Sequence, residues 1–402
     1  MSKSVTSTGV KDYGVRGKLS NPYPLIPTPD EQEAGAPGLY IHVPFCKTKC
    51  PYCDFYSVTD LTLVEGWLRA LKKEMNLYRN NFGTFDSLYI GGGTPTVLSD
   101  PAMTSLFEEL HNHFSFAHDT EITVEVNPDD ISLKKLELLK SLGVNRLSIG
   151  VQSFNDDELK LLKRRHTHQG AEKALRFINS AGFTNFGIDL MYGLPGQDLE
   201  SWIETLRKAL TFYPTHMSCY QLTFEETTPF GKMLEQGSLQ ACTEKQGKDF
   251  FLATSSFLEQ NGFIHYEISN FSKGNEFRSR HNCKYRHHIP YLSLGPGAHS
   301  FRNGLRWWNV RSIEDYCSNL QKGLRPIGGS ETLTSEQFRL EKLMLGFRTR
   351  DGVLLDDACP EYTPNGLLED ITKMRLVSIH GNRLIPSKKG FLMADQLPLL
   401  FP

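Results

Sequence analysis

The sequence predicts an α/β protein in which a parallel sheet forms a partial (β/α)6 barrel, followed by a small C-terminal α/β accessory domain. Short apolar segments with strand character alternate with longer segments of helical periodicity from Gly38 to about residue 245. Repeated strand–helix units produce parallel sheets, and six of them suggest a closed or incomplete barrel. The 402-residue chain, with 39% hydrophobic residues, is long enough for this domain and a further one.

The expected elements follow in order along the chain. Residues 1–37, rich in Ser, Thr, Gly and Pro, predict a disordered lead-in; an organelle transit peptide is the alternative, weakened by the acidic residues among them. Strands are expected at residues 39–43, 87–90, 121–126, 144–149, 185–191 and 216–222. Helices are expected at 61–78 and at 133–142, where Ser132 is placed as an N-cap and Gly143 as the stop.

The chain is expected to divide after its lead-in into three parts. The barrel spans residues 38–245, because the strand–helix rhythm changes there. Residues 246–329 form an extension, with a helix at 248–260 and then a loop-rich segment rich in His and aromatic residues. Residues 330–402 suggest helix, turn, helix and a strand pair around Leu376 and Leu384, so we expect a winged-helix-like domain.

Charge and hydropathy exclude two classes of partner. The 44 Lys and Arg residues against 46 Asp and Glu residues give a formal charge of -2, so no net basic field would attract nucleic acid. No segment approaches the roughly 18 consecutive apolar residues of a membrane span, and no apolar signal segment follows the start. We therefore expect a cytoplasmic protein.

The cysteines carry the strongest chemical signal. Cys46, Cys50 and Cys53 directly follow the first expected strand, and barrel chemistry sits at the carboxyl ends of strands. A structural zinc site needs a fourth ligand, and His42, four residues before Cys46, leaves a Cys₃His zinc site open. The remaining cysteines are expected to be buried apolar residues or incidental thiols: Cys219, Cys242, Cys283, Cys317 and Cys359.

Three cysteines on a [4Fe-4S] cube leave one iron without a protein ligand, as a ligand-exchanging centre requires. The Cys-x-x-x-Cys-x-x-Cys spacing, with Tyr52 before the last cysteine, resembles the radical S-adenosylmethionine (SAM) superfamily, in which the amino and carboxylate groups of SAM chelate the open iron. The Gly-rich turn at residues 91–95 follows the second expected strand, at the place where this family has such a turn. Glycine there lets a ligand approach the backbone.

The resemblance also implies the side chains around SAM. Glu125 would be the carboxylate near SAM, Gln152 a ribose-binding amide, Arg164 the cation for a carboxylate and Asp189 a ribose acceptor. Singly, each could be an ordinary polar strand end, turn residue or solvated side chain. The implied metal ligands are Cys46, Cys50 and Cys53, and the implied cofactor contacts are Tyr40, Tyr52, Gly92, Gly93, Thr94, Glu125, Gln152, Arg164, Asp189 and His281.

Four segments together resemble one branch of that superfamily, the coproporphyrinogen dehydrogenase (HemN)-like proteins, over about residues 38–400: residues 40–46, 91–95, 150–154 and 192–196. The dehydrogenases carry a further cysteine two residues past the third, where this chain has Phe55, and an ordered N-terminal arm that residues 1–37 do not resemble. The HemW-like heme chaperones lack that cysteine and have a His-Asn-x-x-Tyr-Trp motif. His281, Asn282 and Tyr285 match this motif, whereas Arg286 replaces the Trp.

Histidine is a common ligand of heme iron, so His281 is the candidate heme ligand, with His287 and His288 as alternatives. The ordinary alternative is that His281 and Asn282 fix a loop by hydrogen bonds. The resemblance implies a heme chaperone that binds heme and a [4Fe-4S] cluster with exchangeable SAM, accepts electrons from a donor, and transfers heme to an acceptor protein. Oxygen-independent coproporphyrinogen III dehydrogenation is the enzymatic alternative, and a structural zinc protein is the alternative outside the family. The sequence leaves catalysis, the acceptor and a homodimer open.

Overall fold

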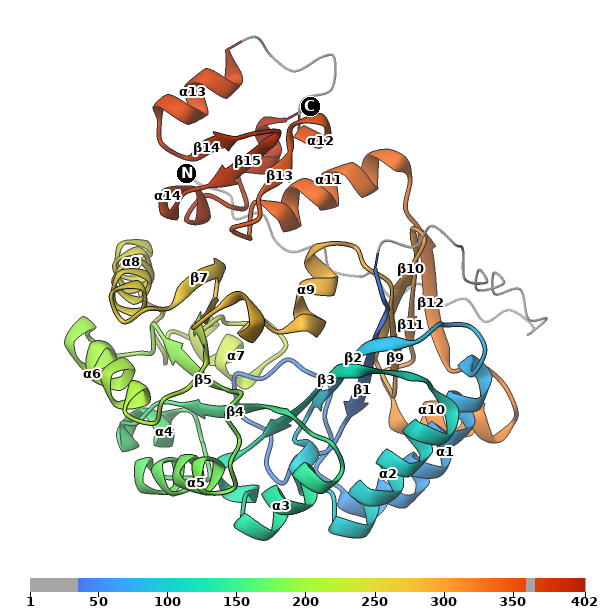
Figure 1. The fold of residues 1–402 in the computed structure, drawn as a ribbon. Helices are drawn as coiled ribbons and strands as arrows, with labels where there is room; N and C mark the ends of the chain where they lie inside the picture. The colour runs from blue at the N-terminus through green and yellow to red at the C-terminus, as the bar shows by residue number, and fades with distance from the viewer. Residues whose placement is uncertain (1–34, 359–365, 402) are drawn as a thin grey trace.

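The computed structural model describes residues 35–358 and 366–401, and its centre is one curved, 12-stranded mixed sheet (Figure 1). The strand order is β12-β11-β10-β9-β1-β2-β3-β4-β5-β6-β8-β7, and the seven strands from β9 to β6 pair in parallel. The strands are β1 (Gly38–Val43), β2 (Phe85–Gly92), β3 (Phe116–Val126), β4 (Arg146–Gln152), β5 (Phe186–Tyr192), β6 (His216–Gln221), β7 (Ile264–Glu267), β8 (Asn270–Ser272), β9 (Tyr291–Leu294), β10 (His299–Arg302), β11 (Leu305–Asn309) and β12 (Ile327–Thr332).

Helices cover the outer face of this sheet (Figure 1). They are α1 (Val64–Tyr78), α2 (Asp100–His113), α3 (Leu133–Ser141), α4 (Asp156–Leu161), α5 (His168–Ser180), α6 (Leu199–Leu210), α8 (Glu244–Gln260) and α10 (Ile313–Gln321). Many begin at a residue whose side chain accepts a first-turn amide; at α3 the expected cap, Ser132, accepts from Lys135. Two short helices, α7 (Pro229–Glu235) and α9 (Arg280–Arg286), lie at the ends of the barrel. Short 3-10 helices are η1 (Leu61–Leu63), η2 (Pro95–Val97), η3 (Pro128–Asp130) and η4 (Asn275–Phe277).

The two faces of the strands differ in polarity because strand side chains alternate in direction. Along β4, Leu147, Ile149 and Val151 are buried in the main core with the helices. The residues between them, Arg146, Ser148, Gly150 and Gln152, all line the interior of the barrel. The sheet therefore has an apolar outer face under the helices and a polar inner face.

The predicted α/β partial barrel is confirmed, with every expected strand within a few residues of an observed one. The expected loop-rich extension is wrong in part, because residues 264–309 contain five short strands that extend the sheet at both ends. Strands of only three to five residues give little periodic signal, so the sequence did not reveal them. The expected domain boundary at residue 330 falls inside β12, which belongs to the large sheet.

The C-terminal domain has its own core and its own sheet. It consists of α11 (Ser335–Gly346), β13 (Val353–Leu354), α12 (Leu355–Ala358), α13 (Leu367–Lys373), β14 (Val377–His380), β15 (Arg383–Pro386), α14 (Lys388–Phe391) and η5 (Leu397–Leu400). The antiparallel sheet has the order β13-β15-β14, and Leu343, Phe347 and Leu384 are buried in the core of this domain. Helices followed by a strand pair were expected here, and the structure has them.

Other expectations concern the termini and the thiols. The predicted disordered lead-in lies almost wholly outside the described residues, as does Cys359. The other seven cysteines are free; Cys219 is buried, and the three scattered ones besides it are half-buried. Among the helices of residues 35–358 and 366–401, none combines the length and apolar character needed to cross a bilayer.

Candidate cofactor site

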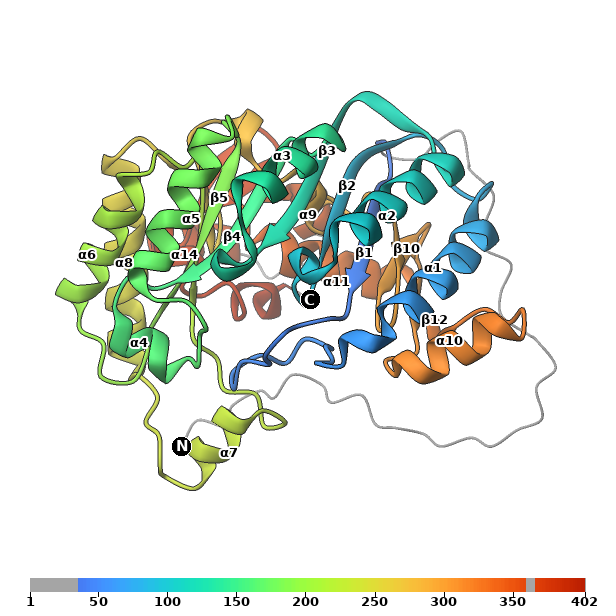
Figure 2. The same cartoon turned by 90° about the horizontal axis from the view of Figure 1, so that it is seen from below.

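The inner face of the barrel encloses a cavity of about 630 Å³. The loop that follows β1, residues 44–60, runs beside the segment that carries α7 (Figure 2), and residues of both segments line the cavity. Two hydrogen bonds join these segments: Phe230 N donates to Pro51 O over 3.0 Å, and Thr227 Oγ1 donates to Asp54 Oδ1 over 2.7 Å. The cavity therefore has a constructed rim at the carboxyl ends of the strands, where barrel sites form.

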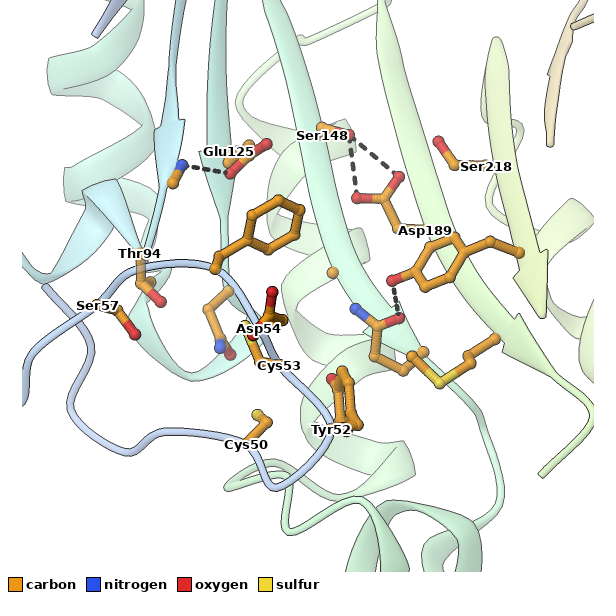
Figure 3. A pocket seen from close by; sticks show the side chains of 18 of the residues that line it. Cys50, Tyr52, Cys53, Asp54, Ser57, Thr94, Glu125, Ser148, Asp189 and Ser218 are labelled. Atoms are coloured by element: carbon orange, nitrogen blue, oxygen red, sulfur yellow. Dashed lines mark hydrogen bonds between the residues drawn. The ribbon is translucent and has the colours of Figure 1, made fainter. Parts of the chain in front are cut away.

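All three clustered cysteines line this opening, and each is half-buried. Figure 3 shows Cys50, Tyr52 and Cys53 on the loop that passes in front of the strands. Two side chains lie at hydrogen-bonding distance from the sulfurs: Thr94 Oγ1 is 3.6 Å from Cys46 Sγ, and Arg164 Nη1 is 3.7 Å from Cys50 Sγ. A hydroxyl and a guanidinium so placed can donate hydrogen bonds to sulfur, and the thiolate is the form of cysteine that binds metal.

The three cysteine sulfurs are not arranged in a metal-binding geometry in this structure. In the described part of the chain, no three His, Cys, Asp or Glu side chains lie close enough together to ligate one metal ion. Burial also raises the pKa of the Cys46 and Cys53 thiols. The donor set nevertheless fits a [4Fe-4S] cluster, because three thiols on one loop face one cavity beside two sulfur hydrogen-bond donors.

The zinc alternative loses its fourth ligand. His42 is buried, its Nε2 lies 2.9 Å from Tyr56 O, and its Nδ1 lies 3.2 Å from Tyr40 Oη. Burial lowers the pKa of His42 to about 4, so the ring is neutral and both nitrogens are occupied. His42 is absent from the cavity lining, so the structure gives no support to a Cys₃His site.

The Gly-rich turn packs the cysteine loop against the sheet. Gly93 N donates to Val43 O over 2.8 Å and Thr94 N donates to Phe45 O over 2.7 Å. A Cβ on Gly93 would lie 2.6 Å from Phe45 O, and one on Gly91 would lie 2.8 Å from the Glu125 carboxylate. Glycine is therefore required for close approach of the backbones, and Gly92, Gly93 and Thr94 line the cavity as expected.

Glu125 and Asp189 line the cavity from neighbouring parts of the sheet (Figure 3). Tyr89 Oη donates to Glu125 Oε1 over 2.8 Å and Gly92 N donates to Oε2 over 3.1 Å, while Ser148 Oγ lies 3.2 Å from both oxygens of Asp189. Burial raises the pKa of Glu125 to about 7 and that of Asp189 to about 6. Both carboxyls can therefore change protonation when a charged ligand enters.

Gln152 and Arg164 also line the cavity, and Arg164 lies beside the cysteine loop. Gln152 has a φ of 69°, which is unusual for a residue with a side chain, and its Oε1 accepts from Tyr220 Oη over 2.6 Å. Arg164 Nη2 donates to Gly150 O over 2.6 Å, and the Nε of Arg164 has no hydrogen-bond partner. An unpaired buried donor at a cavity wall is available to a ligand.

Tyr40 and His281, the other two predicted contacts, do not line the cavity. His281 is 1% exposed on α9; its Nδ1 lies 3.2 Å from Ser87 Oγ and its Nε2 lies 2.8 Å from Tyr285 Oη. The Tyr40 ring lies 6.1 Å from the His281 ring. Burial lowers the pKa of His281 to about 3. In this structure both ring nitrogens of His281 therefore have hydrogen-bond partners within the fold.

A second cavity of about 260 Å³ lies between α9, the β7–β8 edge and the C-terminal domain. Asn270 and Asn282 line both cavities. Of the three candidate histidines, His287 lines this second cavity, and neither His281 nor His288 lines either of the two cavities described. Arg286, which stands in place of the motif Trp, also lines it and forms an ion pair with Glu267 over 2.5 Å.

Several cavity residues were not predicted from the sequence: Tyr89, Arg146, Ser148, His216, Ser218, Tyr220 and Asn270. A signal for some was present. In β4 and β6 the polar residues recur at every second position between apolar ones, as at Arg146, Ser148, Gly150 and Gln152. Such alternation inside a barrel identifies the inner face.

Comparison with known proteins agrees with this geometry. Residues 40–209 match the family model of the radical SAM superfamily. The heme chaperone HemW of Bacillus subtilis (strain 168) is 33% identical over 89% of this chain and 97% of its own length, and that of Synechocystis sp. is 36% identical over 78% of each. A solved structure of coproporphyrinogen III oxidase (HemN) from Escherichia coli covers 91% of this chain and 90% of its own, with a TM-score of 0.77 at 24% identity, and so shares the fold.

The barrel, the cysteine loop and the family match together define a radical SAM protein. Superfamily membership implies a [4Fe-4S] cluster and SAM. Within the superfamily, the chain belongs to the HemN-like branch and, in that branch, to the family of proteins named HemW.

Proposed function

We propose that this protein is a cytoplasmic heme chaperone that holds a [4Fe-4S] cluster with exchangeable SAM, binds heme and transfers it to an acceptor protein. The observation that carries the proposal is the match to relatives named heme chaperones across 89% of this chain. Phe55 supports it, because the residue where the dehydrogenases are expected to carry a further cysteine is here an exposed phenyl ring at the cavity rim.

Cys46, Cys50 and Cys53 would hold the cluster. SAM would lie beside it, in the part of the first cavity lined by Glu125, Arg164 and Asp189. The free Arg164 Nε is suited to a carboxylate, the Asp189 carboxyl to ribose hydroxyls, and Glu125 to an ammonium group. When bound, the cluster and SAM supply one-electron chemistry. The chain's own residues orient the ligand, and the rim made by residues 44–60 and the α7 segment limits the access of water.

Heme would occupy the region where the two cavities meet. Asn282 of the His-Asn motif faces both cavities, and His287 faces the second. We favour His287 over His281 as a ligand to heme iron, because both ring nitrogens of His281 are already hydrogen-bonded inside the fold. In this proposal His281 is a positioning residue for α9.

The test uses the full chain purified without air and loaded with iron and sulfide. We expect one heme to bind per chain, heme to pass to apo-myoglobin as a test acceptor, and incubation with coproporphyrinogen III, SAM and dithionite to give no catalytic turnover. Repeated turnover to protoporphyrinogen would establish the dehydrogenase alternative. Failure to bind heme would overturn the chaperone proposal.

The cluster is tested by Cys50→Ala, with Cys317→Ala as the matched control. Both cysteines are free and half-buried, but Cys317 lies on α10, away from the cavity. Two thiolates do not hold a cube firmly, so Cys50→Ala should lose most of its iron and its visible absorbance, whereas Cys317→Ala keeps them. Equal iron content in the two variants would refute the ligand assignment, and stoichiometric zinc would favour the structural zinc alternative.

A further inference from the structure

The cavity extends well past the residues assigned to SAM, toward α9 at the amino-terminal ends of the strands. Its lining there includes Arg146 and His216, each 1% exposed. Register places both on the inner face: Arg146 lies beside Thr123 of β3, and His216 lies beside Gly187 of β5. The Nε of Arg146 and the Nδ1 of His216 have no hydrogen-bond partner. We call these two residues the cavity floor.

The unpaired His216 nitrogen is a donor. His216 Nε2 lies 2.8 Å from Tyr266 Oη, and the same phenol oxygen accepts from Ser279 N over 3.5 Å. The Tyr266 proton needs an acceptor, and His216 Nε2 is the neighbour in position to accept it. Burial, aided by Arg146, holds the pKa of His216 well below its usual value, so the ring carries one proton. That proton therefore sits on Nδ1.

Gly187 keeps this donor accessible. A Cβ at position 187 would lie 3.0 Å from His216 Nδ1, closer than ordinary van der Waals contact. The strand position between Ser148 and His216 is thus empty of side-chain atoms on the cavity side. A buried N–H left uncovered by a glycine is suited to a ligand acceptor.

Arg146 supplies the charge. Its Nη1 donates to Thr123 Oγ1 over 3.4 Å, and its Nε lies 4.0 Å from Glu121 Oε2, too far for a hydrogen bond. Glu121 Oε1 accepts instead from the backbone N–H groups of Arg280, over 2.9 Å, and His281, over 3.4 Å. Glu121 is therefore the ion-pair partner of Arg146 but leaves its Nε–H free to make a charge-assisted hydrogen bond to a ligand.

The nearby acids do not exclude an anion. Glu125 and Asp189 lie one or two positions further along the same face, toward the cysteine loop. Their pKa values of about 7 and about 6 allow either side chain to take up a proton near neutral pH when negative charge enters the cavity. Arg146 Nε and His216 Nδ1 are both unpaired N–H donors on the cavity wall, so they suit an oxygen acceptor, and a guanidinium prefers a carboxylate.

We propose that Arg146 and His216 form a subsite for a ligand carboxylate and, resting on the function proposed above, that this carboxylate is a heme propionate. Asn270 and Asn282 line both cavities, so a heme that spans the two cavities would place its iron toward His287 and a propionate toward the floor. The floor is distinct from the residues expected to bind SAM, which lie nearer the cysteines.

The test compares heme with heme dimethyl ester, in which both propionates are masked. Cluster-loaded full chain is titrated anaerobically with each, and SAM binding is measured in parallel. The variants are Gly187→Ala, which covers His216 Nδ1, and Arg146→Lys, which keeps the charge but removes the Nε donor. Gly83→Ala is the control, because a Cβ there meets nothing within 4 Å. If Arg146→Lys fails to fold, Gly187→Ala still decides.

We expect the unaltered chain to bind heme at least about tenfold more tightly than the ester, as one charge-assisted hydrogen bond provides. Gly187→Ala should lose that preference and keep its affinity for the ester and for SAM. Equal affinity of the unaltered chain for heme and ester would overturn the subsite alone. If Gly187→Ala lost SAM binding while its heme binding was unaffected, the floor would be assigned to SAM, and the carboxylate subsite would also be overturned. Binding of neither porphyrin would overturn the proposed function, and the subsite with it.

Discussion

At the scale of single residues, Gln152 joins backbone strain to a cavity contact. Its φ of 69° lies in the left-handed region, where a side chain costs about 1 kcal/mol, and its amide accepts from Tyr220 Oη. Such strain persists where the surrounding structure fixes it, often at a binding site. The strained backbone at the end of β4 therefore lowers stability, and it directs the Gln152 amide into the cavity.

We therefore expect Gln152→Gly to unfold at higher urea than Gln152→Ala. Both variants lose the Tyr220 hydrogen bond, but glycine relieves the strain and alanine does not, so glycine should be more stable by about 1 kcal/mol. In an ordinary strand the order is the reverse. SAM affinity should fall equally in both. An alanine variant as stable as the glycine variant would show that the φ of residue 152 carries no strain.

The sequence was informative where chemistry is local and weaker where it depends on packing. Motif order placed Glu125, Gln152, Arg164 and Asp189 in one site, and the structure brings all four to one cavity. The direction of His281 depends on Ser87, 194 positions away in the chain, and no local pattern reveals such a contact. Arg146 was missed for the same reason. It matters because its buried Nε has no hydrogen-bond partner, and only the folded structure shows which donors remain unpaired.

At the scale of elements, long buried parallel strands were predictable and short edge strands were not. The strands β1 to β6 are apolar on their outer face and are followed by amphipathic helices, which gives a strong periodic signal. Strand β8 has three residues and pairs antiparallel with β6, so its existence depends on a neighbour rather than on its own sequence. Helix α9, seven residues long, is likewise held by contacts to β2 and β3.

Two histidines at the ends of α9 should therefore behave differently when replaced by alanine. His281→Ala loses two buried hydrogen bonds and should cost about 2–3 kcal/mol in the free energy of unfolding, with heme affinity per folded chain unchanged. His287 is exposed, so His287→Ala should cost less than about 1 kcal/mol yet lower heme affinity at least about tenfold. Urea unfolding and heme titration on both variants measure this. The opposite pattern would restore His281 as the ligand.

At the scale of the whole molecule, the C-terminal domain closes the second cavity by docking on the barrel edge. Ile268 N donates to Arg348 O over 3.0 Å, and Arg350 N donates to Tyr266 O over 2.9 Å. Asp351 pairs with Arg278 over 3.1 Å and with His287 over 3.4 Å. The partners come from segments more than 60 residues apart, so the sequence predicted the domain but not its docking. Because Thr349 and Asp351 line the second cavity, the docked C-terminal domain forms part of its wall.

Asp351→Asn should loosen this docking without unfolding the barrel. The His287 hydrogen bond, with Arg278, lowers the pKa of Asp351 to about 2, so its carboxylate stabilises docking above its usual pKa and that contribution is lost only as pH falls toward 2. With the side chain about one-third exposed, we expect roughly 1 kcal/mol near neutral pH, or about fivefold faster hydrogen exchange at the Ile268 and Arg350 amides. Glu369→Gln, which removes an exposed pair within α13, should change neither amide. Faster exchange throughout β2 and β3 would instead mean that Asp351 supports the whole barrel, and unchanged exchange at both amides would mean that the two backbone hydrogen bonds hold the domain without it.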